Sequence, residues 1–354
     1  MRGYRGSVAA VVLIAGFCWP GPASAGEFPE FTVNSTEDAV DAVGDGICAT
    51  AAGTCTLRAA FMEAEAAAHT TITLPAGRFN LALAPSTGCL FSATDCTGGS
   101  SKDGDLVVQS SVTLRGAGEN DAVIDGGDMS RVFVNAHQGS RFEVSDLTIA
   151  NGHPRGPEDD LPQTGWGGGI MNYGQLQVNR VTLTGNQSQV GGAIFNVPTS
   201  NIHLENSTLS NNLATTEGGG MRIDGPGTVV NTRIIGNRVG SGCCPLGGST
   251  PPGTPFGEGG GIDMRALGDV TIANSTITGN HAVLGGGGIN YAYNYYGALV
   301  PPGVKLGGRL IVQDSTISGN TSDFGPGNCQ ILAATLEPRG QNTDDDGTCG
   351  FAPD

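Results

Sequence analysis

Two short phrases alternate along the chain and return at a nearly constant interval. The first is an aliphatic strand that ends in Gly-Asn or a similar pair, and its copies are Leu147–Gly152, Val181–Asn186, Thr208–Leu213, Arg233–Arg238, Thr276–His281 and Thr316–Thr321. The second is a glycine run leading into one apolar residue, with copies at Gly167–Ile170, Gly191–Ile194, Gly218–Met221, Gly259–Ile262 and Gly286–Ile289. Successive copies near the middle lie about 25 residues apart, which is at the short end of the periods of solenoid proteins.

The residues inside each unit have the spacing of β-strands. Gln175–Arg180 alternates polar and apolar side chains and places Leu176 and Val178 on one face. Each unit holds three strands: the glycine-rich one, the alternating one and the one that ends in Gly-Asn. Stacked units place each strand about 4.8 Å from its equivalent one turn away and bury one continuous aliphatic core. The sequence therefore predicts an all-β chain, a right-handed parallel β-helix with about 25 residues per coil.

Glycine and asparagine mark the predicted corners between these strands. The chain has 59 glycines in 354 residues, and both residue types tolerate the left-handed backbone that a sharp corner needs. One corner position repeats as Asn186, Asn237, Asn280 and Asn320. We expect these asparagines to hydrogen-bond along the stack as a structural ladder. Leucine-rich repeats, calcium-bound β-rolls and propellers are disfavoured because their repeat signatures are absent.

The ends of a solenoid need caps, since an uncovered coil exposes its core. Thr56–Ala68 is predicted to form a short helix, with Thr56 as N-cap and apolar residues at helical spacing. It precedes the first strand and turn, Thr71–Gly77. The helix is expected to lie over the first coil as a lid.

The N-terminus and the cysteines indicate export. Residues 1–25 carry two arginines, an apolar run and Ala23-Ser24-Ala25, which predicts a cleaved signal peptide rather than an uncleaved membrane anchor. Eight of the nine cysteines follow it, an even number typical of disulfides. The pairs that we expect from proximity are Cys48 with Cys55, Cys89 with Cys96, and Cys329 with Cys349. Cys243 and Cys244 form a vicinal disulfide or bridge elsewhere; a zinc site is disfavoured because C-x-x-C pairs are absent.

Both ends resemble those of bacterial exported parallel β-helix proteins. Phe31–Thr36, Gly44–Cys48 and Cys55–Ala60 resemble the N-terminal CSLREA motif, read here as Cys-Thr-Leu-Arg-Ala-Ala, and Gly340–Cys349 is similar to the closing segment of "choice-of-anchor" domains. The resemblance implies secretion or display on the surface of a bacterium. It supplies no agreed activity and no catalytic residues. With no anchor recognised before Asp354, release is expected at least as readily as attachment.

These observations predict four parts. They are a signal peptide at 1–25, a CSLREA-like cap with a helix at 26–70, coils with loop insertions at 71–322, and a disulfide-closed C-terminal cap at 323–354. The formal charge of −16 disfavours nucleic acid and anionic membrane surfaces as partners. After signal cleavage, no segment is predicted to cross a membrane.

The search for catalytic residues gives no constellation that could be assigned. Asn342–Asp346 mimics a phrase of pectin-type hydrolases, but the His and basic motifs expected downstream of it are absent. Arg222, Arg233 and Arg265 lie beside the core pattern, and we expect no acid cluster at one-coil spacing to accompany them. Asp224 and Asp263 occur in neighbouring coils, where a carbohydrate cleft would be conceivable; solvated outward side chains are the simpler interpretation.

Calcium is the one cofactor that a motif in the sequence suggests. Asn342, Asp344 and Asp346, followed by Gly347, fit the first half of a calcium loop, although Pro353 replaces the expected glutamate. A plain acidic turn closed by Cys349 is the alternative.

Insertions are the places where a repetitive scaffold gains function. They are 152–165, 240–257 and 291–308, and the last contains four of the six tyrosines in the chain: Tyr291, Tyr293, Tyr295 and Tyr296. If these tyrosines are exposed, they bind sugar rings or a protein surface; otherwise they pack the loop against its own coil.

The function expected from the sequence is non-enzymatic binding or adhesion to an extracellular polysaccharide or protein. The alternative is a polysaccharide lyase or glycoside hydrolase with the pectin-lyase-like fold. Acids and a base that converge over two or three adjacent coils would favour the enzyme.

Overall fold

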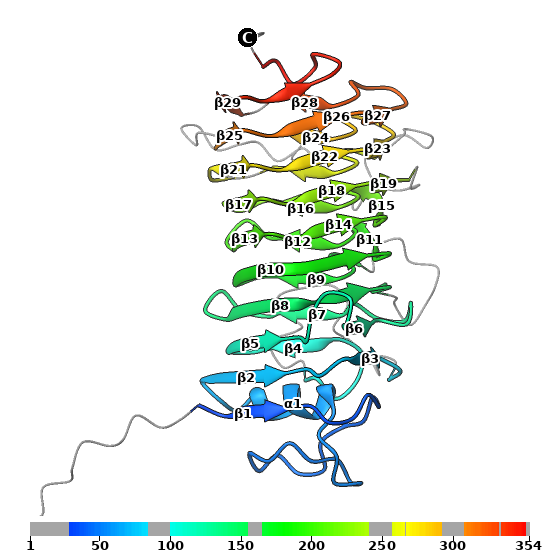
Figure 1. Ribbon diagram of the computed structural model, residues 1–354, viewed down its shortest axis with the longest axis vertical. Coiled ribbons are helices and arrows are strands. Elements are labelled where there is room, and N and C mark those ends of the chain that lie inside the picture. Colours follow the sequence, from blue (N-terminus) through cyan, green and yellow to red (C-terminus); the bar gives the residue numbers. More distant parts are fainter. Residues whose placement is uncertain are drawn as a thin grey trace, which may run out of the picture.

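The chain forms a tall stack of coils that begins with the N-terminal segments and ends with the C-terminal ones (Figure 1). The computed structural model describes residues 28–83, 100–154, 165–240, 257–265, 267–291, 308–332 and 334–351. Within these ranges the strands belong to three sheets, which we name sheets A, B and C, and all pairings are parallel. This confirms the predicted fold, a right-handed parallel β-helix.

Sheet A is the largest of the three and contributes two strand segments to most coils. Its strands are β1 (Glu30–Thr32), β2 (His69–Thr73), β3 (Gly77–Asn80), β5 (Ser111–Arg115), β6 (Ala122–Asp125), β8 (Arg141–Ala150), β10 (Gln175–Thr184), β13 (Asn201–Glu205), β14 (Thr208–Ser210), β17 (Gly227–Val230), β18 (Arg233–Ile235), β21 (Val270–Ala273), β22 (Thr276–Thr278), β25 (Arg309–Gln313), β26 (Thr316–Ser318), β29 (Thr335–Arg339) and β30 (Thr343–Asp344).

Sheets B and C complete the coil with shorter strands. Sheet B consists of β4 (Leu106–Val108), β7 (Phe133–Asn135), β9 (Ile170–Asn172), β12 (Ile194–Asn196), β16 (Met221–Ile223), β20 (Ile262–Met264), β24 (Ile289–Tyr291) and β28 (Cys329–Ile331). Sheet C consists of β11 (Gln187–Val190), β15 (Leu213–Glu217), β19 (Arg238–Val239), β23 (His281–Ala282) and β27 (Thr321–Ser322). A coil therefore runs from sheet B through sheet A to sheet C.

The sheet assignment differs from the prediction in one respect. The alternating strand and the strand that ends in Gly-Asn were expected on separate faces, but both lie in sheet A, where β10 joins them without a break. One left-handed residue marks the junction of the two segments in each of these coils: Arg180 within β10, and Asn206 or Asn231 between the separate strands of the next coils. The third face is sheet C, which starts after the asparagine corner.

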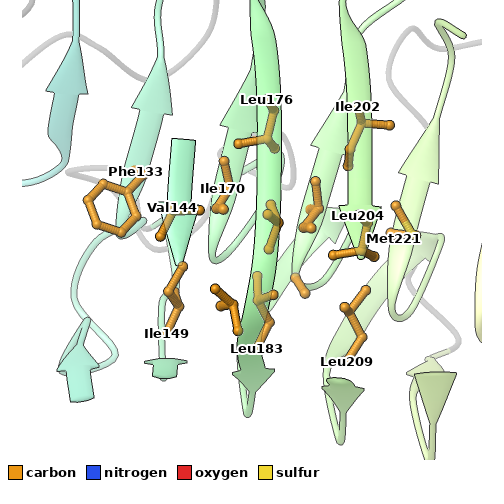
Figure 2. Close-up of a cluster of buried hydrophobic side chains, with 14 of the residues drawn as sticks. Phe133, Val144, Ile149, Ile170, Leu176, Leu183, Ile202, Leu204, Leu209 and Met221 are labelled. Atoms are coloured by element: carbon orange, nitrogen blue, oxygen red, sulfur yellow. The ribbon is translucent and has the colours of Figure 1, made fainter. Parts of the chain in front are cut away.

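The register confirms the coil length. Leu176 of β10 lies opposite Ile202 of β13, and Ile202 lies opposite Gly227 of β17. Inward side chains from successive coils stack on one another, so that Phe133, Ile170 and Met221 line up from sheet B against Leu183 and Leu209 from sheet A (Figure 2). These side chains are buried, and each contributes about 1.5–3 kcal/mol relative to an exposed position. The core is continuous from the first coils to the last.

The predicted asparagine ladder is present and longer than expected. The side-chain amide of each member donates to the Oδ1 of the next, at 3.0 Å from Asn186 to Asn212 and 2.9 Å from Asn212 to Asn237. The series continues through Asn280, Asn320 and Asn328. Each Oδ1 also accepts the backbone N–H of the previous member, as in Asn237 N to Asn280 Oδ1 at 2.9 Å. The ladder thus satisfies backbone groups that the corner would otherwise leave buried without partners.

The N-terminal helix α1 (Leu57–Ala64) covers the first coil, as predicted, but ends before Ala68. Thr56 is its N-cap, accepting the Ala59 N–H at 3.1 Å. Phe61 packs against Phe133, with ring centroids 5.5 Å apart. Apolar contact with the core therefore holds the lid in place (Figure 1).

Two of the expected disulfides are confirmed, Cys48–Cys55 beside α1 and Cys329–Cys349 at the C-terminal end. Cys89, Cys96, Cys243 and Cys244 lie outside the described residues, and so does the predicted signal peptide. Among the described residues, no helix has both the length and the apolar character needed to cross a membrane.

Candidate functional site

The outer face of sheet B carries one side chain from the middle of each three-residue strand. Because strands alternate their side chains, the first and third residues point into the core and the second points outward. The register aligns these outward residues in one row, which we name the outer row: Val107, Val134, Met171, Phe195, Arg222, Asp263, Asn290 and Gln330. It changes from apolar to polar between β12 and β16.

The long insertions of the chain all adjoin sheet B. Segments 84–99, 155–164 and 241–256 precede β4, β9 and β20, and segment 292–307 follows β24. These segments themselves lie outside the described residues. Each segment joins a strand of sheet B to a strand of sheet A or C, and insertions in a solenoid often collect on one face.

The apolar half of the outer row forms a second hydrophobic cluster, separate from the core. Met171 and Phe195 pack there with Val190, and the partly buried Trp166 and Tyr173 flank them. The rings of Trp166 and Phe195 meet edge to face with centroids 5.3 Å apart. In this half Met171 and Phe195 are buried, and the partly buried rings of Trp166 and Tyr173 flank them.

Arg222 connects the apolar half to an ionic cluster. Its guanidinium lies 6.0 Å from the centre of the Phe195 ring, within cation–π range. It forms ion pairs with Glu217 and Asp224, and a third with Asp263 at 3.0 Å. Three carboxylates from two coils thus share one arginine.

Arg265 extends the same cluster in the next coil. It forms an ion pair with Glu217, and its Nη2 lies 3.8 Å from Glu258 Oε2. Glu217 and Glu258 occupy equivalent positions, because the backbones of the two residues pair across the stack. Two arginines and four carboxylates therefore converge over adjacent coils, and most of their side-chain surface is buried.

Asn290 adds an amide to the cluster from the coil above. Its Nδ2 donates to Asp263 Oδ1 at 2.6 Å and to Glu258 Oε2 at 3.2 Å. Its Oδ1 is fully buried and has no hydrogen-bond partner among the described residues. A buried amide oxygen without a partner is uncommon and indicates a position at which a donor could bind.

Burial and charge separate the pKa values of the carboxyl groups in this cluster. Burial raises the pKa of Asp263 to about 7, although Arg222 and Arg265 act in the opposite direction. Burial also acts to raise the pKa of Glu217, but the two arginines outweigh it and hold that pKa below its usual value. The cluster therefore holds one carboxyl group that changes charge near neutral pH beside one that stays ionised.

This cluster corrects one expectation from the sequence. Arg222, Arg265, Asp224 and Asp263 were considered, but no acid cluster at one-coil spacing was expected with them. That expectation was wrong, because Glu217 and Glu258 each directly precede a Gly-Gly-Gly copy and so fall at the same place in adjacent coils. Arg233 belongs to β18 of sheet A and takes no part in the cluster.

The position of Tyr291 corrects a second expectation from the sequence, that this residue is exposed and binds a ligand. Tyr291 is the third residue of β24 and points into the core opposite Met264. It is fully buried, its hydroxyl accepts the Gly308 N–H at 3.1 Å, and burial raises its pKa to about 12. Tyr291 therefore cannot present its ring to a ligand. Tyr293, Tyr295 and Tyr296 lie outside the described residues.

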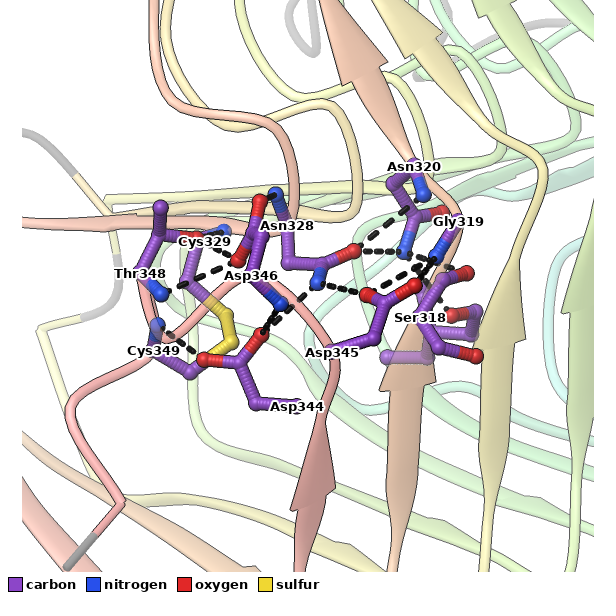
Figure 3. Close-up of a disulfide and its surroundings, with 11 residues drawn as sticks. Ser318, Gly319, Asn320, Asn328, Cys329, Asp344, Asp345, Asp346, Thr348 and Cys349 are labelled. Atoms are coloured by element: carbon purple, nitrogen blue, oxygen red, sulfur yellow. Dashed lines mark hydrogen bonds between the residues drawn. A yellow bond between two sulfur atoms is a disulfide. The ribbon is translucent and has the colours of Figure 1, made fainter.

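The C-terminal acids close the asparagine ladder (Figure 3). Asn328 Nδ2 donates to Asp344 at 2.7 Å and to Asp345 at 2.6 Å, and Asp346 accepts the Asn328 N–H at 3.0 Å. These contacts help to lower the pKa of Asp345, and hydrogen bonds with Thr348 outweigh burial and lower that of Asp346 to about 2. Each of the three aspartates has a carboxylate oxygen within 4.8 Å of one from each of the other two, a spacing at which they could bind a metal ion together.

Asn342 has a different role from these aspartates. Its Oδ1 accepts the Ser315 N–H at 3.0 Å and its Nδ2 donates to Val312 O at 2.9 Å, which continues the corner hydrogen bonds of sheet A. Calcium binding by Asn342, Asp344 and Asp346 stays a prediction.

Comparison with known proteins gives only remote structural likenesses. No protein-family model matches the chain, and no curated protein matches it. A pectin methylesterase solved in complex with a hexasaccharide is similar at 12% identity, with 85% of this chain and 87% of that chain covered and a TM-score of 0.45. The rice weevil pectin methyl esterase has 12% identity, coverages of 93% and 92%, and a TM-score of 0.39. The A-module of the Azotobacter vinelandii mannuronan C-5 epimerase AlgE6 has 16% identity, coverages of 84% and 95%, and a TM-score of 0.28. Likenesses this remote do not identify a function.

Proposed function

We propose that this protein is exported and binds an extracellular polysaccharide along the outer row of sheet B. The observation that carries the proposal is the convergence of aromatic, charged and amide side chains in that row, on the sheet that the insertions adjoin. Ligand sites combine apolar surface with a few polar groups that converge in the same way. Export rests on the predicted signal peptide, and two disulfides are compatible with it.

The chemistry of the row suits a sugar polymer. Trp166 and Tyr173 are partly buried, so each leaves some ring surface for the apolar face of a sugar. Farther along, the half-buried Gln330 carries an amide that can both donate to and accept from hydroxyl groups. Successive coils lie about 4.8 Å apart, so a polymer that lies along the stack could make similar contacts with several neighbouring coils.

Charge favours a neutral polysaccharide over an acidic one. The chain has 33 acidic and 17 basic residues, and the arginines of the outer-row cluster are already paired with carboxylates. A polyanion would meet Glu258 and its neighbours, and the two arginines described in this cluster already balance carboxylates of the protein. We therefore expect neutral glycans to bind more tightly than polyuronates.

Binding is tested with the mature protein and a panel of neutral and acidic polysaccharides in pull-down assays. Trp166→Ala and Tyr173→Ala should each weaken binding to the best ligand about tenfold or more, since each removes ring surface that flanks the outer row. Phe28→Ala is the matched control, because Phe28 is 58% exposed beside His69 of sheet A, at the N-terminal end of the stack. Unchanged affinity in both the Trp166 and the Tyr173 variants, or an equal loss in the control, would refute the proposal.

A glycoside hydrolase or polysaccharide lyase is the second candidate, favoured by one observation. Asp263, with its raised pKa, and Glu258 accept hydrogen bonds from the same amide of Asn290. A pair of carboxyl groups is what glycoside hydrolysis uses as acid and base. New reducing ends or unsaturated products in the same assays, lost in Asp263→Asn, would establish this candidate over binding alone.

A further inference from the structure

The ionic cluster on sheet B has more carboxylates than guanidinium groups. Among the described residues its two arginines are Arg222 and Arg265, and its four acids are Glu217, Asp224, Glu258 and Asp263. Even with a proton on Asp263, three negative charges face two positive ones. A surface with an excess of one sign of charge attracts ligands of the opposite sign. The cluster therefore favours a cation as its ligand.

Glu258 is the acid of this cluster that a ligand can reach most readily. Its side chain is 18% exposed, against 13% for Asp224 and 9% for Glu217. Its ion pair with Arg265, at 3.8 Å, is the longest of those described in the cluster, and Arg265 also pairs closely with Glu217. Glu258 therefore keeps the capacity to bind a second cation.

A buried amide oxygen beside Glu258 supplies an acceptor that lacks a donor. Asn290 Nδ2 lies 3.2 Å from Glu258 Oε2, while Asn290 Oδ1 has no hydrogen-bond partner among the described residues. A Cβ built on Gly285 would lie 2.5 Å from this Oδ1 and 3.1 Å from Gln330 Oε1. Two amide oxygens from adjacent coils thus converge at a glycine, beside the half-buried Gln330 side chain. A donor bound there would satisfy an acceptor that is costly to leave unpaired.

We propose that the polar end of the outer row binds the protonated amine of an amino-sugar polymer, with Glu258 and Asn290 Oδ1 as its acceptors. The inference rests on the proposed function and names the class of polysaccharide. An ammonium group has three N–H donors and no acceptor, so it can satisfy a carboxylate and an amide oxygen together. A hydroxyl or an acetylated amine is neutral and leaves the excess negative charge unbalanced. Trp166 and Tyr173 are the contacts for other sugar rings of the same polymer.

The test compares two oligosaccharides of equal length in calorimetric titrations of the mature protein at mildly acidic pH. They are the hexamers of glucosamine and of N-acetylglucosamine, which have the same backbone and differ in the charge of the amine. We expect the glucosamine hexamer to bind at least tenfold more tightly. This difference should shrink as the salt concentration rises, because salt screens the attraction between charges.

Three variants locate the amine on the outer row. Glu258→Gln keeps the shape of the side chain, and it should weaken binding of the glucosamine hexamer at least tenfold while leaving the affinity for the N-acetylglucosamine hexamer unchanged. Glu30→Gln is the matched control, because Glu30 is an exposed acid of β1 at the N-terminal end of the stack. Gln330→Glu adds a carboxylate beside Asn290 and should strengthen binding of the glucosamine hexamer several-fold. This gain decides the question if Glu258→Gln does not fold.

Several outcomes would overturn the amine site. Equal losses in Glu258→Gln and Glu30→Gln would reduce the preference to a general attraction between an acidic protein and a polycation. Equal affinity for the two hexamers, or an oligolysine peptide that competes as well as the glucosamine hexamer, would also exclude an amino-sugar site. If neither hexamer binds while a neutral polysaccharide of the panel does, the amine site is wrong and the proposed function stands. If no polysaccharide binds, both are wrong.

Discussion

At the scale of single residues, Asp263 has the most unusual environment on the outer row. It lies between Arg222 and Asn290, is fully buried, and has a pKa raised to about 7. An aspartate in the unfolded chain titrates near pH 3.9. Between about pH 4 and pH 7 the folded protein thus keeps a proton that the unfolded chain has lost. The free energy of unfolding should fall as the pH rises through this window.

Asp263→Asn tests this linkage. The variant cannot titrate, so its urea unfolding midpoint should fall less between pH 5 and pH 8 than that of the wild type. Asp345→Asn is the control, because the pKa of Asp345 is lowered and its titration lies below this range. Parallel pH profiles for the wild type and Asp263→Asn would contradict the assignment.

The ladder asparagines and Tyr291 show how far the role of a single residue can be predicted from the sequence. Asn237 and Asn280 could be assigned to a ladder because they recur beside glycine at a fixed period. Asn212 was missed there because Asn211 replaces the glycine before it. Tyr291 was misassigned because its neighbours Tyr293 and Tyr295 suggested an exposed loop. The alternation in Ile289-Asn-Tyr291 already indicated an inward position, since it repeats Ile262-Asp-Met264 one coil earlier.

At the scale of elements, the two kinds of glycine corner have different requirements. Gly219 leaves sheet C for sheet B, where a Cβ would lie 2.4 Å from the carbonyl oxygens of Arg238 and Gly260. Gly279 ends a sheet A strand with φ +65°, and a Cβ there would meet only Gly236 N at 3.9 Å. The equivalent position two coils earlier is Asn211, which has φ 55°. The first corner therefore needs space, and the second needs a left-handed backbone.

Substitutions should separate these two requirements. Gly219→Ala should destabilise the protein by about 3 kcal/mol or more, because backbone atoms of the next coil cannot move away from a new Cβ. Gly279→Asn should change the free energy of unfolding by less than about 1 kcal/mol, since asparagine adopts this conformation elsewhere in the column. Denaturant unfolding of the two variants measures both values. Equal losses would show that the corners are not distinct.

Element boundaries were only partly predictable. The strand pattern identified the segments of sheet A but placed them on two faces, because period-two alternation does not show whether the chain bends between them. The junction is a single left-handed residue in each coil, Arg180 within β10 and Asn206 in the next coil. The ionic cluster was missed for a related reason. Glu217 and Glu258 precede glycine runs, and only the coil register shows that they meet.

At the scale of the whole molecule, stability should vary along the stack. Each coil contacts only its neighbours. A central coil is therefore stabilised by contacts with two coils, and a terminal coil by contacts with one. Amide hydrogen exchange should therefore be slowest in β10, β14 and β18 and at least tenfold faster in β1 and β29, which pair on one side only. Mass spectrometry of peptides from the exchanged protein measures this gradient. Uniform protection would indicate that the solenoid unfolds as one unit.

The architecture could be derived from the sequence because every coil repeats the same physical constraints. The function could not, because the insertions break the period and the outer row depends on side chains that no repeat dictates. Phe195, Arg222 and Asp263 occupy the same structural position and differ completely in chemistry. A structural position that recurs in every coil therefore does not predict the chemistry of the side chain that occupies it.

The connection between β19 and β20 contains an insertion that breaks the period of the coils, yet the hydrogen bonds of the asparagine ladder beside it are unchanged. Segment 241–256 intervenes there, yet Asn237 and Asn280 on either side keep their bond at 3.0 Å, as Asn186 and Asn212 do where the coil has no insertion. The length of chain between two neighbouring asparagines of the ladder therefore does not change the hydrogen bond that joins them.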